Sequence, residues 1–427
     1  MTLLFRTVRR LFTAVWLMIA LYCIGEVGVR VWDGFTGKVS QRLGDDPDLL
    51  VRSWTVHHEL KPQQQVTRKT DKGKAVVIKT NSRGLRGSEV QVPKPTGVYR
   101  IVCLGDERIL GPHVREAETF PVQLQNLLQS RSSEKIEVIN AGVPDYCPLL
   151  SEIQFEQKLV LLQPDLVLLN FDMTDVADDY RYRRGVTFDE GGHPLSCVHS
   201  SLDLPHRPGD WLFGESLMLP RWGRHALATW WCNNAFTGGR GDICNPAGKY
   251  CWIEDQPPDW SIHINHALTP IAGLRDRAKS LSANFVLTVC PAPFQVSPTA
   301  CNGIGVRTAA GVKRRGVYNN VEPFQRVQEY CQRERILCCD VTPALKQDPA
   351  KDQLFLKSAI ELSGAGNGVF ARTVGVFLVR NVSGAWRGPG VAPVSSDPGI
   401  SPAAFHSQRS GKQDIREKNL RTVEHTE

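Results

Sequence analysis

Four short segments of this 427-residue chain hold side chains that could do chemistry together: 105–107, 140–142, 172–175 and 358–361. The first three follow apolar runs, and the fourth precedes an apolar, helix-like stretch. Carboxyl groups recur among them, at Glu107, Asp175 and Glu361. Carboxyl groups transfer protons in general acid–base catalysis, and they bind hard cations through oxygen. The segments therefore predict a polar crevice, provided that the fold brings them to one place.

The elements that must position these segments alternate between strands and helices. The stretch Val98 to Gly111 is typical of a buried strand followed by a sharp turn at Gly105-Asp106. We expect strands at 101–104, 136–140, 166–171, 284–290 and 336–341. We expect helices at 121–131, 149–163, 271–281 and 321–331, and a last helix that starts near Ser363. This order predicts an α/β fold with a doubly wound parallel sheet of about five strands and helices on both faces. The carboxyl ends of such strands face a crevice.

Composition narrows the class of protein. Hydrophobic residues make up 41% of the chain and charged residues 22%, which is typical of a folded protein. The net charge of +7 is spread along the chain without a block of like charges, so nothing indicates a nucleic-acid partner. No Cys/His spacing is typical of a zinc site, and we expect neither a bound metal nor a cofactor.

The N-terminus indicates a membrane anchor. An apolar stretch from Leu11 to Val29 follows Arg6, Arg9 and Arg10, and no small-residue cleavage site comes after it. By the positive-inside rule, the short N-terminus lies in the cytoplasm and the main domain outside it. We therefore expect a single-pass membrane protein.

The domain organisation follows from these patterns. We expect a cytoplasmic tip and anchor over 1–30, a β-rich lead-in over 31–97, the α/β domain over 98–372, and a disordered tail over 373–427. An insertion over 181–258 holds half of the ten Trp residues, namely Trp211, Trp222, Trp230, Trp231 and Trp252. These Trp rings could stack on sugar rings, or they could form a small core of the insertion.

The four segments, in this order and spacing, resemble the SGNH (GDSL-type) hydrolase family over about Val98 to Arg372. The sequence motifs that support this resemblance include Leu104-Gly-Asp106, Glu118-Thr-Phe-Pro121, Val138-Ile-Asn-Ala-Gly-Val143, Pro164-Asp165 and Leu362-Ser-x-x-Gly366. The anchor and the 81–87 lead-in look like those of envelope-facing members. The resemblance implies ester hydrolysis or acyl transfer, often on carbohydrates. It also implies a Ser nucleophile after Gly-Asp, a Gly and an Asn that stabilise the oxyanion, and a His base oriented by an Asp.

Most of these family positions are substituted here. Glu107 stands in place of the Ser, Thr174 in place of the Asn and Glu361 in place of the His, whereas Gly142 matches the Gly. The orienting Asp would fall on Ser358 or Ala359. A carboxylate cannot replace a serine alkoxide in an ordinary acyl-enzyme, because the product would be a labile anhydride. The resemblance therefore predicts a protein in which the usual ester-hydrolase mechanism is lost.

Three hypotheses remain open from the sequence. The first is a non-catalytic protein whose crevice binds a glycan, a lipid or a protein, with a carbohydrate or an acylated envelope ligand as the expected partner. The second is altered chemistry, in which Glu107 and Glu361, with Asp106 and Asp175 nearby, do acid–base work of the glycosidase kind or bind a hard cation. The third is that other residues serve, with Ser151, Ser363 and His113 as the nearest candidates.

Overall fold

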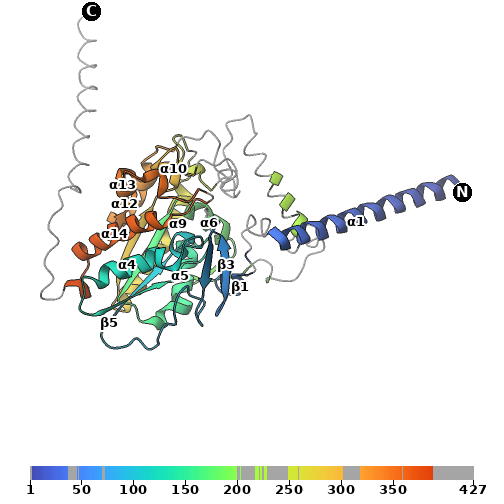
Figure 1. Ribbon diagram of the computed structural model, residues 1–427. Coiled ribbons are helices and arrows are strands. Elements are labelled where there is room, and N and C mark those ends of the chain that lie inside the picture. The colour runs from blue at the N-terminus through green and yellow to red at the C-terminus, as the bar shows by residue number, and fades with distance from the viewer. Residues whose placement is uncertain are drawn as a thin grey trace, which may run out of the picture. The chain divides into compact units, whose positions relative to one another are not determined.

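The computed structural model describes residues 2–36, 46, 48–69, 73–199, 202, 217–220, 222–223, 226–227, 249–257, 259–301, 318–357 and 359–387 (Figure 1). All structural statements below concern these residues. The expected tail from 388 onward, and Trp211, Trp230 and Trp231 of the insertion, lie outside the described residues.

A five-stranded parallel sheet forms the centre of the α/β domain, in the order β11-β10-β7-β5-β6. The strands are β5 (Val98–Leu104), β6 (Lys135–Asn140), β7 (Leu166–Asp172), β10 (Asn284–Cys290) and β11 (Leu337–Asp340). In chain order the sheet reads 2-1-3-4-5, which is a doubly wound arrangement with its switch point between the first and third strands. The predicted fold class, with five strands, is confirmed.

Strand β5 shows why these apolar runs form a central sheet. Ile101 and Cys103 point into one core, and Val102 and Leu104 point into the other. All four side chains are fully buried. A strand buried on both faces must be apolar at every position, and the run 101–104 is such a strand.

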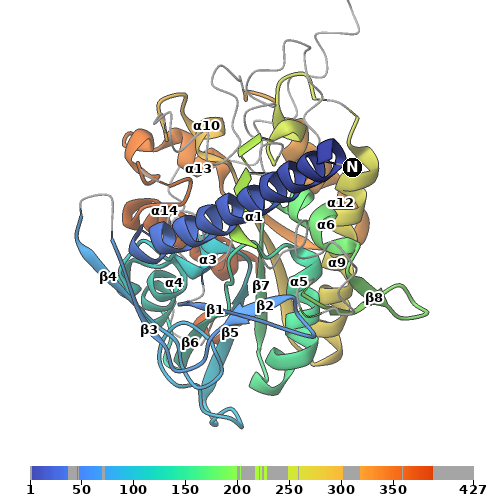
Figure 2. The ribbon, with the colours of Figure 1, turned by 90° about the vertical axis from the view of Figure 1, so that its right-hand side faces the viewer.

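Helices cover both faces of the sheet. The core with Ile101 and Cys103 is closed by α4 (Phe120–Gln129), α13 (Thr342–Gln347) and α14 (Gly364–Asn381), and Figure 1 shows α4 and α14 side by side. The opposite core is closed by α6 (Asp175–Arg183), α9 (Ser261–Ser280) and α12 (Glu322–Glu334). Figure 2 shows α5 (Pro148–Gln154), α6 and α9 grouped together.

Three helical predictions differ from the structure at their ends. Helix α9 begins at Ser261, ten residues before the expected 271. The helix expected over 149–163 is regular only in α5, and it continues as a π-turn (η2, Phe155–Leu159) and a 3-10 turn (η3, Val160–Leu162). The tail was expected to begin at 373, but α14 continues to Asn381 because Val374 and Leu378 are fully buried in the core. Ser363 caps this helix as predicted, since its side chain accepts a hydrogen bond from the Gly366 N–H.

The lead-in forms two antiparallel pairs, β1 (Leu50–Arg52) with β2 (His58–Leu60) and β3 (Gln65–Lys69) with β4 (Ala75–Lys79). Their apolar side chains pack with those of α5 in a third core. The buried Arg86 then donates to the carbonyl oxygens of Leu110, Gly111 and Val114. The lead-in thus fixes the loop that follows the first turn of the α/β domain.

The remaining described elements are short, apart from the N-terminal helix. They are α3 (Glu107–Leu110), η1 (Glu116–Glu118), β8 (Val186–Phe188), β9 (Pro194–Cys197), η5 (Cys251–Ile253), α10 (Pro293–Val296), η6 (Lys351–Gln353) and η7 (Ala385–Arg387). Helix α1 (Thr2–Thr36) contains a stretch, Phe5–Asp33, that is long and apolar enough to cross a membrane.

Candidate functional site

The site begins where β5 ends, at the turn Gly105-Asp106-Glu107. Gly105 has a φ of +144°, and a Cβ there would collide with the side chains of Ile109 and Asn170. Asp106 caps α3 by accepting the Arg108 N–H at 2.9 Å. Glu107 is the first residue of this short helix, so its side chain leaves the chain at the carboxyl end of the sheet.

The carboxylate of Glu107 is held by the loop after β6. The backbone N–H of Asp145 donates to Glu107 Oε2 at 3.1 Å. Asp145 has a φ of 57°, a left-handed conformation that few residues other than Gly and Asn or Asp adopt. Burial, together with the charge of Asp145, raises the pKa of Glu107 to about 7, although the nearby Lys249 opposes the shift. Glu107 is therefore a carboxyl group that can hold a proton at neutral pH.

Gly142 does not present its amide to the site. Its N–H donates to the Asn140 side chain at 3.1 Å. A Cβ at Gly142 would collide with the backbone of α3, at Leu110 N and Asp106 O. Gly142 thus allows close packing of the loop on α3, whereas the amide that faces the Glu107 carboxylate belongs to Asp145. The sequence analysis missed Asp145, although the Pro144-Asp145 pair is typical of a turn.

A lysine from the end of the insertion crosses to the same loop. Lys249 Nζ lies 2.9 Å from a carboxylate oxygen of Asp145 and 2.9 Å from one of Asp178 on α6. Burial opposes the charged form of both side chains, but their attraction to one another outweighs it. The pKa of Lys249 is therefore raised, and that of Asp145 is lowered with a further contribution from Arg181. This network fixes the loop that holds Glu107, and no spacing in the sequence indicates it.

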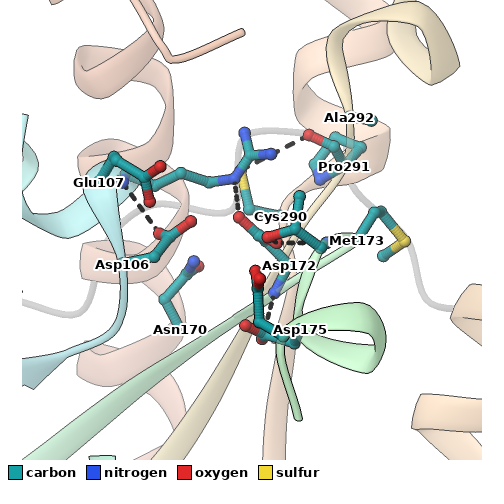
Figure 3. Close-up of polar contacts among 12 residues, drawn as sticks. Asp106, Glu107, Asn170, Asp172, Met173, Asp175, Cys290, Pro291 and Ala292 are labelled. Carbon is teal, nitrogen blue, oxygen red and sulfur yellow. Dashed lines mark hydrogen bonds and ion pairs between the residues drawn. The ribbon is translucent and has the colours of Figure 1, made fainter. Parts of the chain in front are cut away.

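Below Glu107, a buried ion pair joins α3 to the end of β7. Arg108 Nε donates to Asp172, and both side chains are almost inaccessible, at 2% and 0% exposure (Figure 3). Although burial opposes ionisation, Arg108 lowers the pKa of Asp172. Burial and the charge of Asp172 raise the pKa values of the neighbouring Asp106 and Asp175 well above their usual range. The Arg108–Asp172 ion pair therefore stabilises the group of residues that joins α3 to the end of β7.

Thr174 belongs to the same group of residues, because it contacts Asp172. Its hydroxyl donates to Asp172 Oδ1 at 2.8 Å, and its N–H donates to the same oxygen at 2.6 Å. Asp175 accepts the Asp172 N–H at 2.8 Å. These hydrogen bonds fold the segment after β7 back on itself. The Thr174 hydroxyl, at the family's Asn position, thus donates its proton within the protein.

Glu361 reaches the site with an unexpected partner. Its Oε2 lies 2.7 Å from Nδ1 of His113, which comes from the loop after α3. The charge of Glu361 also contributes to the raised pKa of Glu107, so the two carboxyl groups act on one another. Ser358 lies outside the described residues. Of the alternative residues, Ser151 is fully buried and Ser363 caps α14, so only His113 joins the site.

Within the part of the chain that the structure describes, no group of three or more His, Cys, Asp or Glu side chains could hold a metal ion. The contacts instead pair each ionised carboxylate with a cation or a backbone amide. Asp145 contacts Lys249, Asp172 contacts Arg108, and Glu107 accepts an amide hydrogen. The arrangement can transfer a proton at Glu107.

Comparison with known proteins gives likeness at the level of the fold. No family model matches the chain, and no curated protein matches it. Among solved structures, a lipolytic protein of the G-D-S-L family from Desulfitobacterium hafniense is 14% identical, with 65% of this chain and 99% of that chain covered and a TM-score of 0.32. The lipase/acylhydrolase from Enterococcus faecalis is 13% identical, with 66% and 95% covered and a TM-score of 0.34. A catalytic mutant of the acetylxylan esterase Axe2 from Geobacillus stearothermophilus is 13% identical, with 67% and 95% covered and a TM-score of 0.35.

Values this low say nothing about activity, and the fold class stands on the strand order of the sheet. The chain therefore has a doubly wound α/β fold with a five-stranded parallel sheet.

Proposed function

We propose that this chain is a membrane-anchored envelope protein whose SGNH-like crevice binds a ligand and does not hydrolyse esters. One contact carries the proposal, the hydrogen bond from the Asp145 N–H to the Glu107 carboxylate. The amide of Asp145, which faces the nucleophile position, is engaged by the protein's own carboxylate, so it is not free to stabilise an oxyanion there.

The other family positions support the same proposal. The Gly142 N–H donates to Asn140, and the Thr174 hydroxyl donates to Asp172. Glu361 contacts His113, but Glu107 has no hydroxyl that such a base could activate. Removing a single oxyanion donor from an active hydrolase costs about 100-fold or more in kcat. Loss of the nucleophile together with these donors leaves no route through an acyl-enzyme.

The expected ligand is a carbohydrate or an acylated component of the envelope. Helix α1 is long and apolar enough to span a membrane, and Arg6, Arg9 and Arg10 lie near its N-terminal end. The positive-inside rule then places the α/β domain outside the cytoplasm, where such ligands occur. The crevice would bind them through the polar groups around Glu107, Asp145 and Lys249.

The test is ester hydrolysis by the full chain in detergent micelles, with p-nitrophenyl acetate as the probe. We expect the wild type and Glu107→Ala to show the same rate as micelles alone. Saturable turnover in both proteins would overturn the proposal and indicate a different set of catalytic residues. Turnover in the wild type that Glu107→Ala abolishes would overturn it in favour of carboxylate chemistry.

A second candidate function is a hydrolase that uses Glu107 as a general acid. The observation in its favour is the pKa of Glu107, which is raised to about 7 beside a second carboxyl group, Glu361. Retaining and inverting glycosidases both use such a pair. Hydrolysis of p-nitrophenyl glycosides by the wild type, with an alkaline limb near pH 7 that Glu107→Gln removes, would support this candidate. Equal background rates for the wild type and Glu107→Gln would exclude it.

A further inference from the structure

A concave site lies where η5, α9 and α12 meet, apart from the residues around Glu107. It is a pocket of about 300 Å³, lined by residues of η5, the first turn of α9, the first turn of α12 and the segment before α9. Since α9 and α12 pack against parallel strands of the sheet, their first turns lie at its carboxyl end. This is the end that also holds Glu107.

The walls of the pocket are aromatic and rigid. Trp252 is 2% exposed, and its Nε1 donates to the Met173 carbonyl oxygen at 2.8 Å, which fixes the plane of the ring. Trp260, at the N-cap of α9, forms a second aromatic wall, and Pro257 adds a further apolar surface. The partly exposed Trp260 ring and Pro257 offer the flat apolar surface that matches the C–H face of a sugar ring, whereas Trp252 is buried.

The rim of the pocket is polar and pre-organised. Arg326 Nε donates to Glu322 at 2.8 Å, and its Nη1 donates to the Ser261 hydroxyl at 3.1 Å, so the guanidinium is held in one position. Asp259 also lines the pocket and accepts the Ser261 N–H at 3.0 Å. Within the described part of the chain, the buried Nε1 of Trp260 has no hydrogen-bond partner, and such a donor is costly to leave unpaired.

We infer that this pocket binds a neutral saccharide. Carboxylates accept hydrogen bonds from sugar hydroxyls, and a planar guanidinium donates to them. Two carboxylates against one guanidinium disfavour an anionic ligand, and Arg326 in the lining disfavours a cation. The volume is at the lower end for small-molecule pockets, which suits one or two sugar rings.

The pocket is linked to the crevice through the chain itself. Lys249, which bridges Asp145 and Asp178, precedes Trp252 by three residues. One short segment of chain therefore contributes both to the Lys249 network and to the pocket. The inference rests on the proposed function in this one respect, because it names the ligand class for a domain that is proposed to bind and not to hydrolyse.

The test is saturation-transfer difference NMR on the full chain in lipid nanodiscs. The probes are cellobiose, N,N′-diacetylchitobiose and, as a cationic comparison, choline chloride. We expect millimolar binding of at least one disaccharide and weaker binding of choline. Trp260→Ala should weaken disaccharide binding about tenfold or more, as loss of an aromatic anchor does, and Trp260→Phe should weaken it less. The matched control is Trp54→Ala, which removes a Trp of the lead-in that is 62% exposed.

The outcomes separate this inference from the proposed function. Absence of saccharide binding, or equal loss in Trp260→Ala and Trp54→Ala, would overturn the saccharide pocket and leave the esterase result untouched. Binding of choline alone would overturn it in favour of a cation site. Ester turnover would overturn the proposed function but not the pocket.

Discussion

The ion pair between Arg108 and Asp172 gives a quantitative test of how the site is built. At neutral pH, Arg108→Met leaves Asp172 charged and fully buried without its partner. Two opposite unit charges about 4 Å apart attract one another by about 4 kcal/mol at an effective dielectric constant of about 20. Breaking a buried pair typically costs about 3–5 kcal/mol. We therefore expect Arg108→Met to lower the free energy of unfolding by about 4 kcal/mol near pH 7.

The loss should depend on pH in a defined direction. In the wild type the pKa of Asp172 is lowered, so its stabilising effect is present above about pH 4 and lost as the pH falls below that value. In Arg108→Met, burial without a cation raises the pKa of Asp172 above about 4. The folded variant then takes up a proton as the pH falls, and it regains stability. The difference between the two proteins should shrink from about pH 8 to about pH 4.

The assay is urea unfolding of the full chain in detergent micelles, followed by far-UV circular dichroism at several pH values. The matched control is Arg333→Met, which breaks the exposed contact with Glu334 and should cost less than about 1 kcal/mol. The double variant Arg108→Met/Asp172→Asn should recover most of the loss, because it leaves no unpaired charge and keeps an oxygen that accepts the hydrogen bonds of Thr174. A loss below about 1 kcal/mol in Arg108→Met, or a double variant as unstable as the single one, would refute this reasoning.

Three further predictions use the same unfolding assay. Glu107→Gln should remove a pH dependence of stability. Because the pKa of Glu107 is raised to about 7, the free energy of unfolding of the wild type should fall by up to about 1.4 kcal/mol per pH unit as the pH rises from about 4.3 to 7. Equal slopes in both proteins would show that Glu107 titrates normally. Gly142→Ala should cost about 1–3 kcal/mol, since its Cβ would collide with the backbone of α3. Gly223→Ala, whose Cβ would meet open space, should cost nothing, and a similar loss in both would contradict the close-packing role. Ser363→Ala should cost about 1 kcal/mol and Ser363→Gly only a few tenths, because glycine tolerates the N-cap conformation; an undiminished stability in Ser363→Ala would argue against the cap.

Much of the fold could be predicted because strand and helix signals are local. The run 101–104 is apolar at every position since both faces of β5 are buried, and Ser363 is a cap residue placed before an apolar helix. The helix expected over 149–163 shows where such local signals end. Its apolar pattern continues toward Pro164, but the backbone changes to a π-turn at Phe155–Leu159. The spacing of apolar residues does not reveal this change.

The site could be predicted only in part, because its contacts join residues far apart in sequence. Glu107 was found through its place after a strand, and Glu361 through its place before the last helix. The sequence names His113 only as an alternative catalytic residue, and it does not indicate the pairing of His113 with Glu361 or of Lys249 with Asp145. His113 is 248 residues from Glu361, and Lys249 is 104 residues from Asp145. Gly142 is predicted as a site residue from its residue type, whereas the amide that faces Glu107 belongs to Asp145. Residue type does not determine which backbone amide faces a given side chain.

The hydrogen bond between Asp145 and Glu107 has a further consequence for ligand selection. A carboxylate attached to the same chain competes for that amide at a high effective concentration, as any tethered ligand does. An incoming anion must displace this internal competitor, and it must also approach the negative charge that Glu107 carries above about pH 7. A neutral ligand that binds beside Glu107 meets neither obstacle. Under the proposed function, this contact therefore disfavours anionic ligands whatever their shape.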